Sequence, residues 1–187
     1  MPEAWGINAD GTTGPDAGTG PDAAALPAVA RLAEIPGISE DLARAIIAET
    51  GLDMTRFPTA GHLVSWAGLC PSARQSGSRT RAGKKGQGDT WLRGALGQAA
   101  TNAARTATFL GERYHRIARR RGRAKAQVAI ARSILVIIWH LLAGPQDRFT
   151  DLGPDYYASR TDKDKKIRNH IRQLQAPGMD VTIAPAA

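Results

Sequence analysis

The sequence predicts an all-α fold, and three observations carry that prediction. No segment shows the roughly four to eight residues of apolar and polar alternation that indicate a half-buried strand. Several segments instead repeat apolar residues three and four positions apart, which is the spacing of one helix face. Residues that favour helix ends stand beside these segments, such as Asp89 before one and Gly122 after another. The chain has 187 residues, which is long enough to bury a core, and 42% of them are hydrophobic. We therefore expect a compact helical domain.

We divide the chain into three parts, which are a disordered leader at 1–27, a helical domain at 28–150, and a loop with a charged tail helix at 151–187. The leader consists mainly of Gly, Pro, Asp, Thr and Ala, and it repeats the tetrapeptide "GPDA" at Gly14 and Gly20. Such a composition offers too little apolar surface to offset the entropy that ordering costs.

The composition also predicts a cytoplasmic protein. The first residues lack the basic and apolar regions of a secretory signal. Cys70 is the single cysteine, which excludes a disulfide framework and a cysteine-based zinc site. The longest apolar run, at 134–144, is far shorter than the ~20 residues of a membrane span. We therefore expect no membrane partner.

The helical domain starts with two helices and a turn at 32–51. Ser39 is a suitable N-cap for the second helix, and Gly51 a suitable stop. The turn "PGIS" resembles a helix-hairpin-helix, a motif whose turn amides can hold a DNA phosphate. Ser39 replaces the second glycine of that motif and two acids follow it, so plain helix packing is an equal alternative. The buried stripe of the second helix consists of Leu42, Ile46 and Ile47.

Five further helices follow from the same signals. One begins near Pro58 or Thr59 and ends by Gly68, and the next begins after the cap Asp89. A basic helix then runs from 109 and breaks at Gly122. The central core helix covers 124–143, and a charged, weakly amphipathic helix occupies the tail. The apolar stripe of the core helix consists of Val128, Ala131, Leu135, Ile138 and Leu142.

Positive charge is concentrated in one segment. From Arg74 to Lys125 there are fourteen Arg or Lys and two acids, a net of +12, whereas the whole chain carries +8. A solvated face of mixed charge would need interspersed acids, so this pattern indicates a protein that binds a polyanion, most simply nucleic acid. The candidate binding residues form two clusters, Arg74, Arg79, Arg81, Lys84, Lys85 and Arg93 in the first, and Arg113, Arg116, Arg119, Arg120, Arg121, Arg123 and Lys125 in the second.

The first basic cluster lies mostly in a long Gly- and Ser-rich segment that ends at Gly88. We expect this segment to be an irregular loop, because glycine loses the most entropy on ordering and serine competes for backbone hydrogen bonds. Trp66 and Trp91 flank the loop, and we expect them to anchor in the core, with base stacking as the alternative. In the second cluster, helical spacing puts Arg113, Arg116 and Arg120 on one face. The remaining aromatic and histidine candidates, His140, Tyr156 and Tyr157, are expected to pack against the core.

A combination of short motifs resembles a known family. Gly68 to Pro71 read Gly-Leu-x-Pro, Ser76-Gly77 follow five residues later, and Leu92-Arg93 stand after the basic loop. Together with "DLGPDYY" from Asp151, they resemble the C-terminal domain of bacterial insertion-sequence transposases of the IS-one-ten and IS-one-sixteen group, known as bridge-RNA-guided recombinases. The resemblance extends over roughly 35–183.

The resemblance implies that Ser76 is the catalytic serine, which attacks a DNA phosphodiester during strand exchange. Without the resemblance, a serine in this setting is most simply a turn residue that bonds its own backbone. A serine hydroxyl is a weak nucleophile at neutral pH, and attack on phosphate builds negative charge that nearby cations stabilise. The resemblance also implies DNA, a guide RNA and further copies of the chain as partners.

The resemblance further implies an acidic, RNase-H-like domain that binds divalent metal such as Mg²⁺. Only about 34 residues precede the matched region here, and the Asp10, Asp16 and Asp22 among them sit between glycines and prolines that cannot hold a metal cage. We therefore expect a truncated or split transposase that has no metal site of its own and meets the acidic domain in trans. The alternative is a non-catalytic DNA- or RNA-binding helical module, a remnant of such an element.

Overall fold

The computed structural model describes residues 26–70, 73–76, 79–82, 88–160 and 163–182. The chain divides into a first unit that ends at Pro154 and a second that starts at Asp155. Each unit is therefore described by itself, and most of the predicted leader lies outside the described residues.

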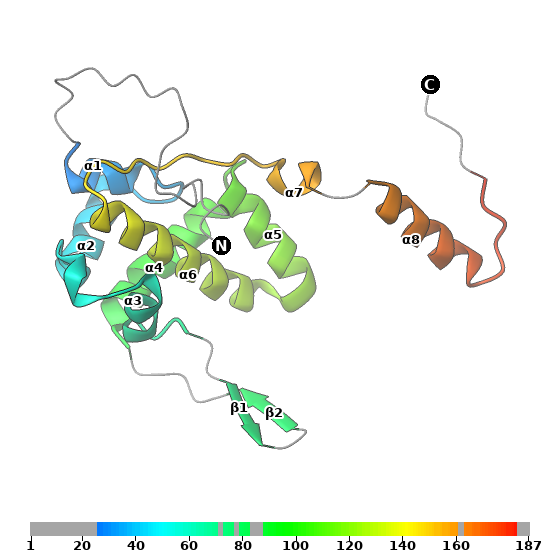
Figure 1. Cartoon of the computed structure of the whole chain (residues 1–187), viewed down its shortest axis with the longest axis horizontal. Helices are drawn as coiled ribbons and strands as arrows, with labels where there is room; N and C mark the ends of the chain where they lie inside the picture. Colours follow the sequence, from blue (N-terminus) through cyan, green and yellow to red (C-terminus); the bar gives the residue numbers. More distant parts are fainter. Residues whose placement is uncertain (1–25, 71–72, 77–78, 83–87, 161–162, 183–187) are drawn as a thin grey trace. The chain divides into compact units, whose positions relative to one another are not determined.

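The first unit is a helical domain, and its helices are shown in chain order in Figure 1. In the described part of this unit, six α-helices and one short 3-10 helix form a common core, which confirms the predicted all-α fold. The helices of this unit are α1 (Ala28–Ala33), α2 (Glu40–Thr50), η2 (Met54–Arg56), α3 (Ala60–Trp66), α4 (Thr90–Ala103), α5 (Phe109–Arg121) and α6 (Arg123–Ala143).

Helix α6 is the centre of this domain. It contacts α1, α3, α4 and α5, and its buried side chains include Ile134, Leu135 and Ile138. By length and composition alone α6 could cross a membrane, but these contacts make it the core helix of the unit. One residue of the predicted stripe is not buried, because Val128 is 40% exposed. No neighbouring helix covers that position fully, so the spacing alone placed it wrongly.

Local sequence signals fix most helix ends as expected. Asp89 caps α4, where its Oδ1 accepts a hydrogen bond from the amide of Leu92 at 2.8 Å. Ser39 caps α2 in the same way, with its Oγ 3.3 Å from the amide nitrogen of Leu42. Gly122 has a φ of 86° and separates α5 from α6, as its position in the sequence predicts.

The segment expected to be an irregular loop contains two short strands. β1 (Ala73–Ser76) pairs antiparallel with β2 (Arg79–Ala82), and these strands appear below α3 in Figure 1. The expectation of a loop without strands was therefore wrong for these eight positions. The strands were missed because they alternate polar with polar or small residues, so apolar alternation could not reveal them.

The second unit contains two helices, α7 (Tyr156–Ser159) and α8 (Lys163–Gln175). In α7 the rings of Tyr156 and Tyr157 meet edge to face, with centroids 5.3 Å apart. The guanidinium carbon of Arg160 lies 4.4 Å from the centre of the Tyr156 ring, which is a cation–π distance. Both of these contacts lie within the second unit.

Candidate nucleic-acid interface

The β-hairpin brings the predicted serine and three arginines into register. Ser76 is paired with Arg79, and Arg74 with Arg81. In an antiparallel pair, direct partners and residues two apart occupy the same face. The register therefore assigns Arg74, Ser76, Arg79 and Arg81 to one face of the hairpin, whereas Gln75 and Thr80 belong to the other. Lys84 and Lys85 lie outside the described residues.

Helix α4 follows the hairpin in the sequence, and two carboxyl groups lie close together at its start. Asp89 caps α4, and it also shares a hydrogen bond with Glu49, which lies in the last turn of α2. Partial desolvation, that hydrogen bond and the charge of Asp89 together raise the pKa of the Glu49 carboxyl above its ordinary value. Two carboxyl groups therefore lie close together at the junction between the end of α2 and the start of α4.

A groove lies beside this junction. It has a volume of about 320 Å³ and runs between the first half of α4 and the first half of α6. Its apolar floor is formed by Leu69, Val128 and Ala131, and Arg93 lines it from α4. Gly94 and Gly97 keep it open, since a Cβ at Gly94 would meet no atom within 4 Å.

The two tryptophans beside the basic segment are not core anchors. Trp91 is 82% exposed, so the prediction that it anchors in the core was wrong. Trp66 is 42% exposed, with its ring 5.5 Å from that of Phe57. Trp91 follows the cap Asp89 by two positions, where no described helix packs over it. Trp139 of α6 contacts a neighbouring segment instead, because its Nε1 donates a hydrogen bond to the carbonyl oxygen of Phe57 at 2.9 Å.

The second basic cluster surrounds the corner where α5 meets α6. The last turn of α5 carries three arginines. Their positive charge is favourable there, because the C-terminal end of a helix carries partial negative charge. The first turn of α6 carries Arg123 and Lys125, no acid, and no side-chain cap at Gly122. Cations at the positive end of a helix are unfavourable by about 0.3–1 kcal/mol each, so helix stability does not explain Arg123 and Lys125.

The members of this cluster differ in their surroundings. Arg119 forms an ion pair with Glu112 at 3.2 Å, two helical turns earlier, which the sequence reasoning did not anticipate. Arg113 is half-buried, whereas Arg116 and Arg120 are exposed and line a shallow hollow together with Ile117 and Arg121. The cations exposed at the corner are Arg120, Arg121, Arg123 and Lys125, and none forms an ion pair with a described residue.

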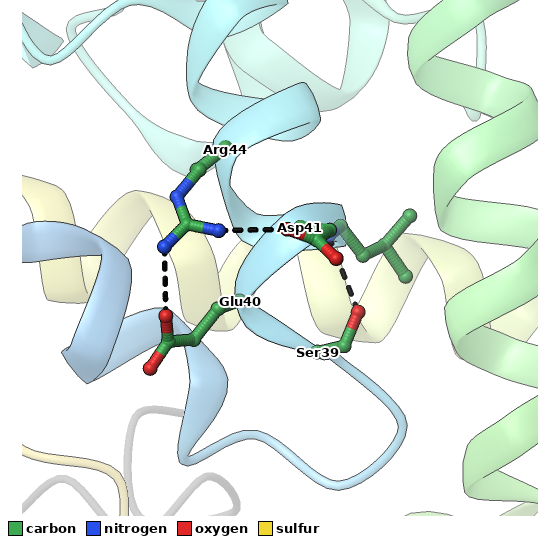
Figure 2. A network of polar contacts seen from close by, with 5 residues as sticks. Ser39, Glu40, Asp41 and Arg44 are labelled. Atoms are coloured by element: carbon green, nitrogen blue, oxygen red, sulfur yellow. Dashed lines mark hydrogen bonds and ion pairs between the residues drawn. The ribbon is translucent and has the colours of Figure 1, made fainter.

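The turn that resembles a helix-hairpin-helix faces α4. A Cβ at Gly37 would overlap the backbone of Ala99 and Ala103, so the turn packs closely on that helix. Figure 2 shows the adjoining start of α2, where Arg44 binds both Glu40 at 2.8 Å and Asp41 at 2.7 Å. Close packing and a pair of acids at this helix start favour the structural reading of the turn over phosphate binding.

The "DLGP" motif has a structural role in the basic helix. Asp151 Oδ1 accepts a hydrogen bond from the amide of Phe109 at 3.1 Å, at the start of α5. Thr108 caps the same helix end, with its Oγ1 3.3 Å from the amide nitrogen of Gly111. Asp151 therefore fastens the chain that follows α6 to the start of the helix that carries the second cluster.

The described residues offer no ligand set for the metal that the resemblance implies. Within the described ranges, no three or more His, Cys, Asp or Glu side chains gather in one place. Asp10, Asp16 and Asp22 lie outside those ranges. His140, the most enclosed histidine candidate, is half-buried, and burial lowers its pKa although the charge of Asp147 opposes that shift. The described residues therefore do not form a site for a divalent metal.

Comparison with known proteins relates part of the chain to transposases. Residues 29–116 match the family described as "Transposase IS116/IS110/IS902 family". A segment of 47 residues is 43% identical to the "Insertion element IS110 uncharacterized 43.6 kDa protein" of Streptomyces coelicolor (strain ATCC BAA-471 / A3(2) / M145). That segment is 25% of this chain and spans only 11% of the relative.

The matched region contains the hairpin, the part of the groove that α4 lines, and most of α5. The chain therefore contains a transposase domain. The domain is of the IS110 type, as the sequence motifs at 68–93 predict.

Proposed function

We propose that this domain binds duplex DNA through the corner between α5 and α6 and presents Ser76 for strand exchange. One observation carries the binding proposal. Arg123 and Lys125 occupy the positive end of α6, where they cost helix stability and have no acid beside them. Phosphate oxygens would offset that cost, because both the cations and the uncapped amides of the helix start attract them.

The hairpin supports the chemical half of the proposal. Its register assigns Ser76 and three arginines to one face, so a phosphodiester that meets the serine also meets positive charge. Attack forms a bond between Ser76 Oγ and phosphorus and breaks the bond to one deoxyribose oxygen, which takes up the proton. Attack by a hydroxyl of the other strand then reverses the process and frees the serine. Arginines on the same face stabilise the charge that develops on the phosphate.

The proposed partners follow from the transposase family. DNA is the substrate, and a guide RNA, further copies of the chain and an acidic Mg²⁺-binding domain complete the assembly. That domain acts in cis or in trans. The alternative is a binding module without chemistry, which the same basic surface also supports, and the two differ in whether a serine-linked DNA intermediate forms.

Salt dependence tests the binding proposal. The variant changes Arg120, Arg121, Arg123 and Lys125 to Gln in the full chain. Its control changes four exposed arginines outside the basic segment, Arg44, Arg56, Arg168 and Arg172, and so removes the same net charge.

Affinity for a short duplex is then measured at several salt concentrations. Each lost phosphate contact should flatten the slope of log K against log salt by about 0.9. We expect a clearly flatter slope for the corner variant and an unchanged slope for the control. Equal slopes for both variants would remove the corner from the interface.

A further inference from the structure

The exposure of Trp91 needs an explanation. A tryptophan buries more apolar area than any other side chain when it packs, yet Trp91 is 82% exposed on the first turn of α4. It is the most exposed of the large hydrophobic side chains that the structure describes. Exposed aromatic rings in a basic setting are the platforms on which proteins stack the bases of single-stranded nucleic acid.

The ring stands next to open space. Gly94 is three positions after Trp91, and residues three apart occupy the same face of a helix. A Cβ at Gly94 would meet no described atom within 4 Å, so the described residues leave the helix surface open about one turn after Trp91. The same glycine lines the groove of about 320 Å³, a size typical of small-ligand sites.

The groove combines apolar and polar groups in a way that suits a nucleotide. Leu69, Val128 and Ala131 give it an apolar floor for the faces of a base. Arg93 contributes the charge that a phosphate needs, and Thr90 contributes a hydroxyl. Gln127 is held rigid, since its Nε2 donates to the carbonyl of Gly97 at 3.1 Å and to Thr101 Oγ1 at 3.0 Å.

We infer that Trp91 and this groove bind an unpaired DNA nucleotide, with the base against the ring or the apolar floor and the phosphate near Arg93. The inference rests on the proposed function, because the groove adjoins the end of the basic segment that carries Ser76. Strand exchange separates paired strands, so unpaired nucleotides arise at that position. The groove would hold one of them out of the duplex while the serine acts.

Binding of matched DNA probes by the full chain tests this inference. The probes are a blunt duplex and the same duplex with a short single-stranded tail. The wild type should prefer the tailed probe. Trp91→Ala should remove that preference, with about tenfold weaker binding of the tailed probe and unchanged binding of the blunt one. Trp91→Phe should keep most of the preference, because it retains an aromatic face.

Gly94→Leu provides a second, independent variant. Its Cβ enters open space and the rest of the leucine side chain extends into the groove, so the fold should persist while the preference for the tail is lost. Gln98→Leu is its control, since Gln98 is exposed one turn further along α4 and does not line the groove. Tryptophan fluorescence gives a direct readout, because a stacked base should quench the emission of Trp91. That quenching should be absent in Trp91→Phe.

The outcomes separate the inference from the proposed function. If the wild type does not bind the blunt duplex, the proposed duplex binding is wrong. If the wild type binds it but shows no preference for the tail, or Trp91→Ala keeps the preference, the inference fails. Tighter binding of a ribonucleotide tail would overturn the assignment to DNA. A change of oligomeric state in Trp91→Ala and Gly94→Leu without an effect on DNA would show a protein interface instead.

Discussion

Arg31 donates a hydrogen bond from Nη1 to the carbonyl oxygen of Gly144 at 2.9 Å, across 113 positions of the chain. The same nitrogen donates to the carbonyl of Leu141, so one buried guanidinium satisfies the C-terminal end of α6. The arginine is only 6% exposed. It thus joins the first helix of the domain to the last turn of the core helix.

We predict that Arg31→Met destabilises the domain by about 1.5–3 kcal/mol, the range for hydrogen bonds to charged groups. Methionine keeps the apolar stem but leaves the carbonyls of Leu141 and Gly144 without a donor. The free energy of unfolding from urea denaturation measures the effect. Arg44→Met is the control, because its ion pairs are exposed and should contribute less than about 1 kcal/mol. Equal losses in both variants would contradict the role assigned to Arg31.

Two glycines should respond in opposite ways to the same substitution. Gly37 has a φ of 94°, and a Cβ there would overlap the backbone of α4, so Gly37→Ala should cost about 2–4 kcal/mol. Gly94 is helical and has open space around it, so Gly94→Ala should stabilise the domain by about 0.5–1 kcal/mol. Thermal unfolding of the two variants checks both signs. A stable Gly37→Ala would mean that the turn does not rest on α4.

These effects show which parts of the structure a sequence can reveal. The caps Ser39 and Asp89 and the break at Gly122 were predicted, because each depends on the chemistry of a few neighbouring residues. The bond from Arg31 to Gly144 joins residues that are remote in sequence, and no local pattern indicates it. Periodicity likewise gave the buried face of α6 but could not show that Val128 lies beyond the reach of the neighbouring helices.

The candidate site was predicted only in part. Charge concentration identified both basic clusters, but it could not show that Arg119 is paired with Glu112. The hairpin was missed, although the dipeptide Gly77-Ser78 between two equal segments is a known hairpin signal in sequences. Trp91 was assigned to the core because tryptophan is usually buried, and only the helix arrangement reveals its exposure. The role of Ser76 remains a prediction.

The neighbouring carboxyl groups of Glu49 and Asp89, at the start of α4, should make the free energy of unfolding depend on pH. The pKa of Glu49 is raised above its ordinary value of 4.5, so its contribution to stability is complete below that value. The contribution is lost as the pH rises through the raised pKa, because the ionised carboxylate then faces Asp89. Glu49→Gln should therefore be more stable than the wild type at pH 7, with the difference vanishing below pH 4.5.

Urea denaturation over a pH series checks this expectation. Asp180→Asn is the control, since that carboxylate is exposed and should give no such difference. A Glu49→Gln variant that is less stable than the wild type at pH 7 would show that the two carboxyl groups do not oppose each other.

We expect Ser76 to matter for strand exchange and hardly at all for folding or DNA affinity. Ser76→Ala removes only a hydroxyl, so stability should change by no more than the ~0.5 kcal/mol usual for surface positions, and duplex affinity should hold. Strand exchange should nevertheless be lost in an assembly supplied with guide RNA and the acidic domain of a complete relative, because Ser76 is the one hydroxyl residue among the four described residues that the register assigns to the arginine face. Thr80→Ala is the matched control, since it removes a hydroxyl from the opposite face of the same hairpin. Arg79→Ala should slow exchange without abolishing it. The measurement is a denaturing-gel search for protein covalently attached to labelled DNA, and an equal amount of adduct from the wild type and Ser76→Ala would place the nucleophile elsewhere.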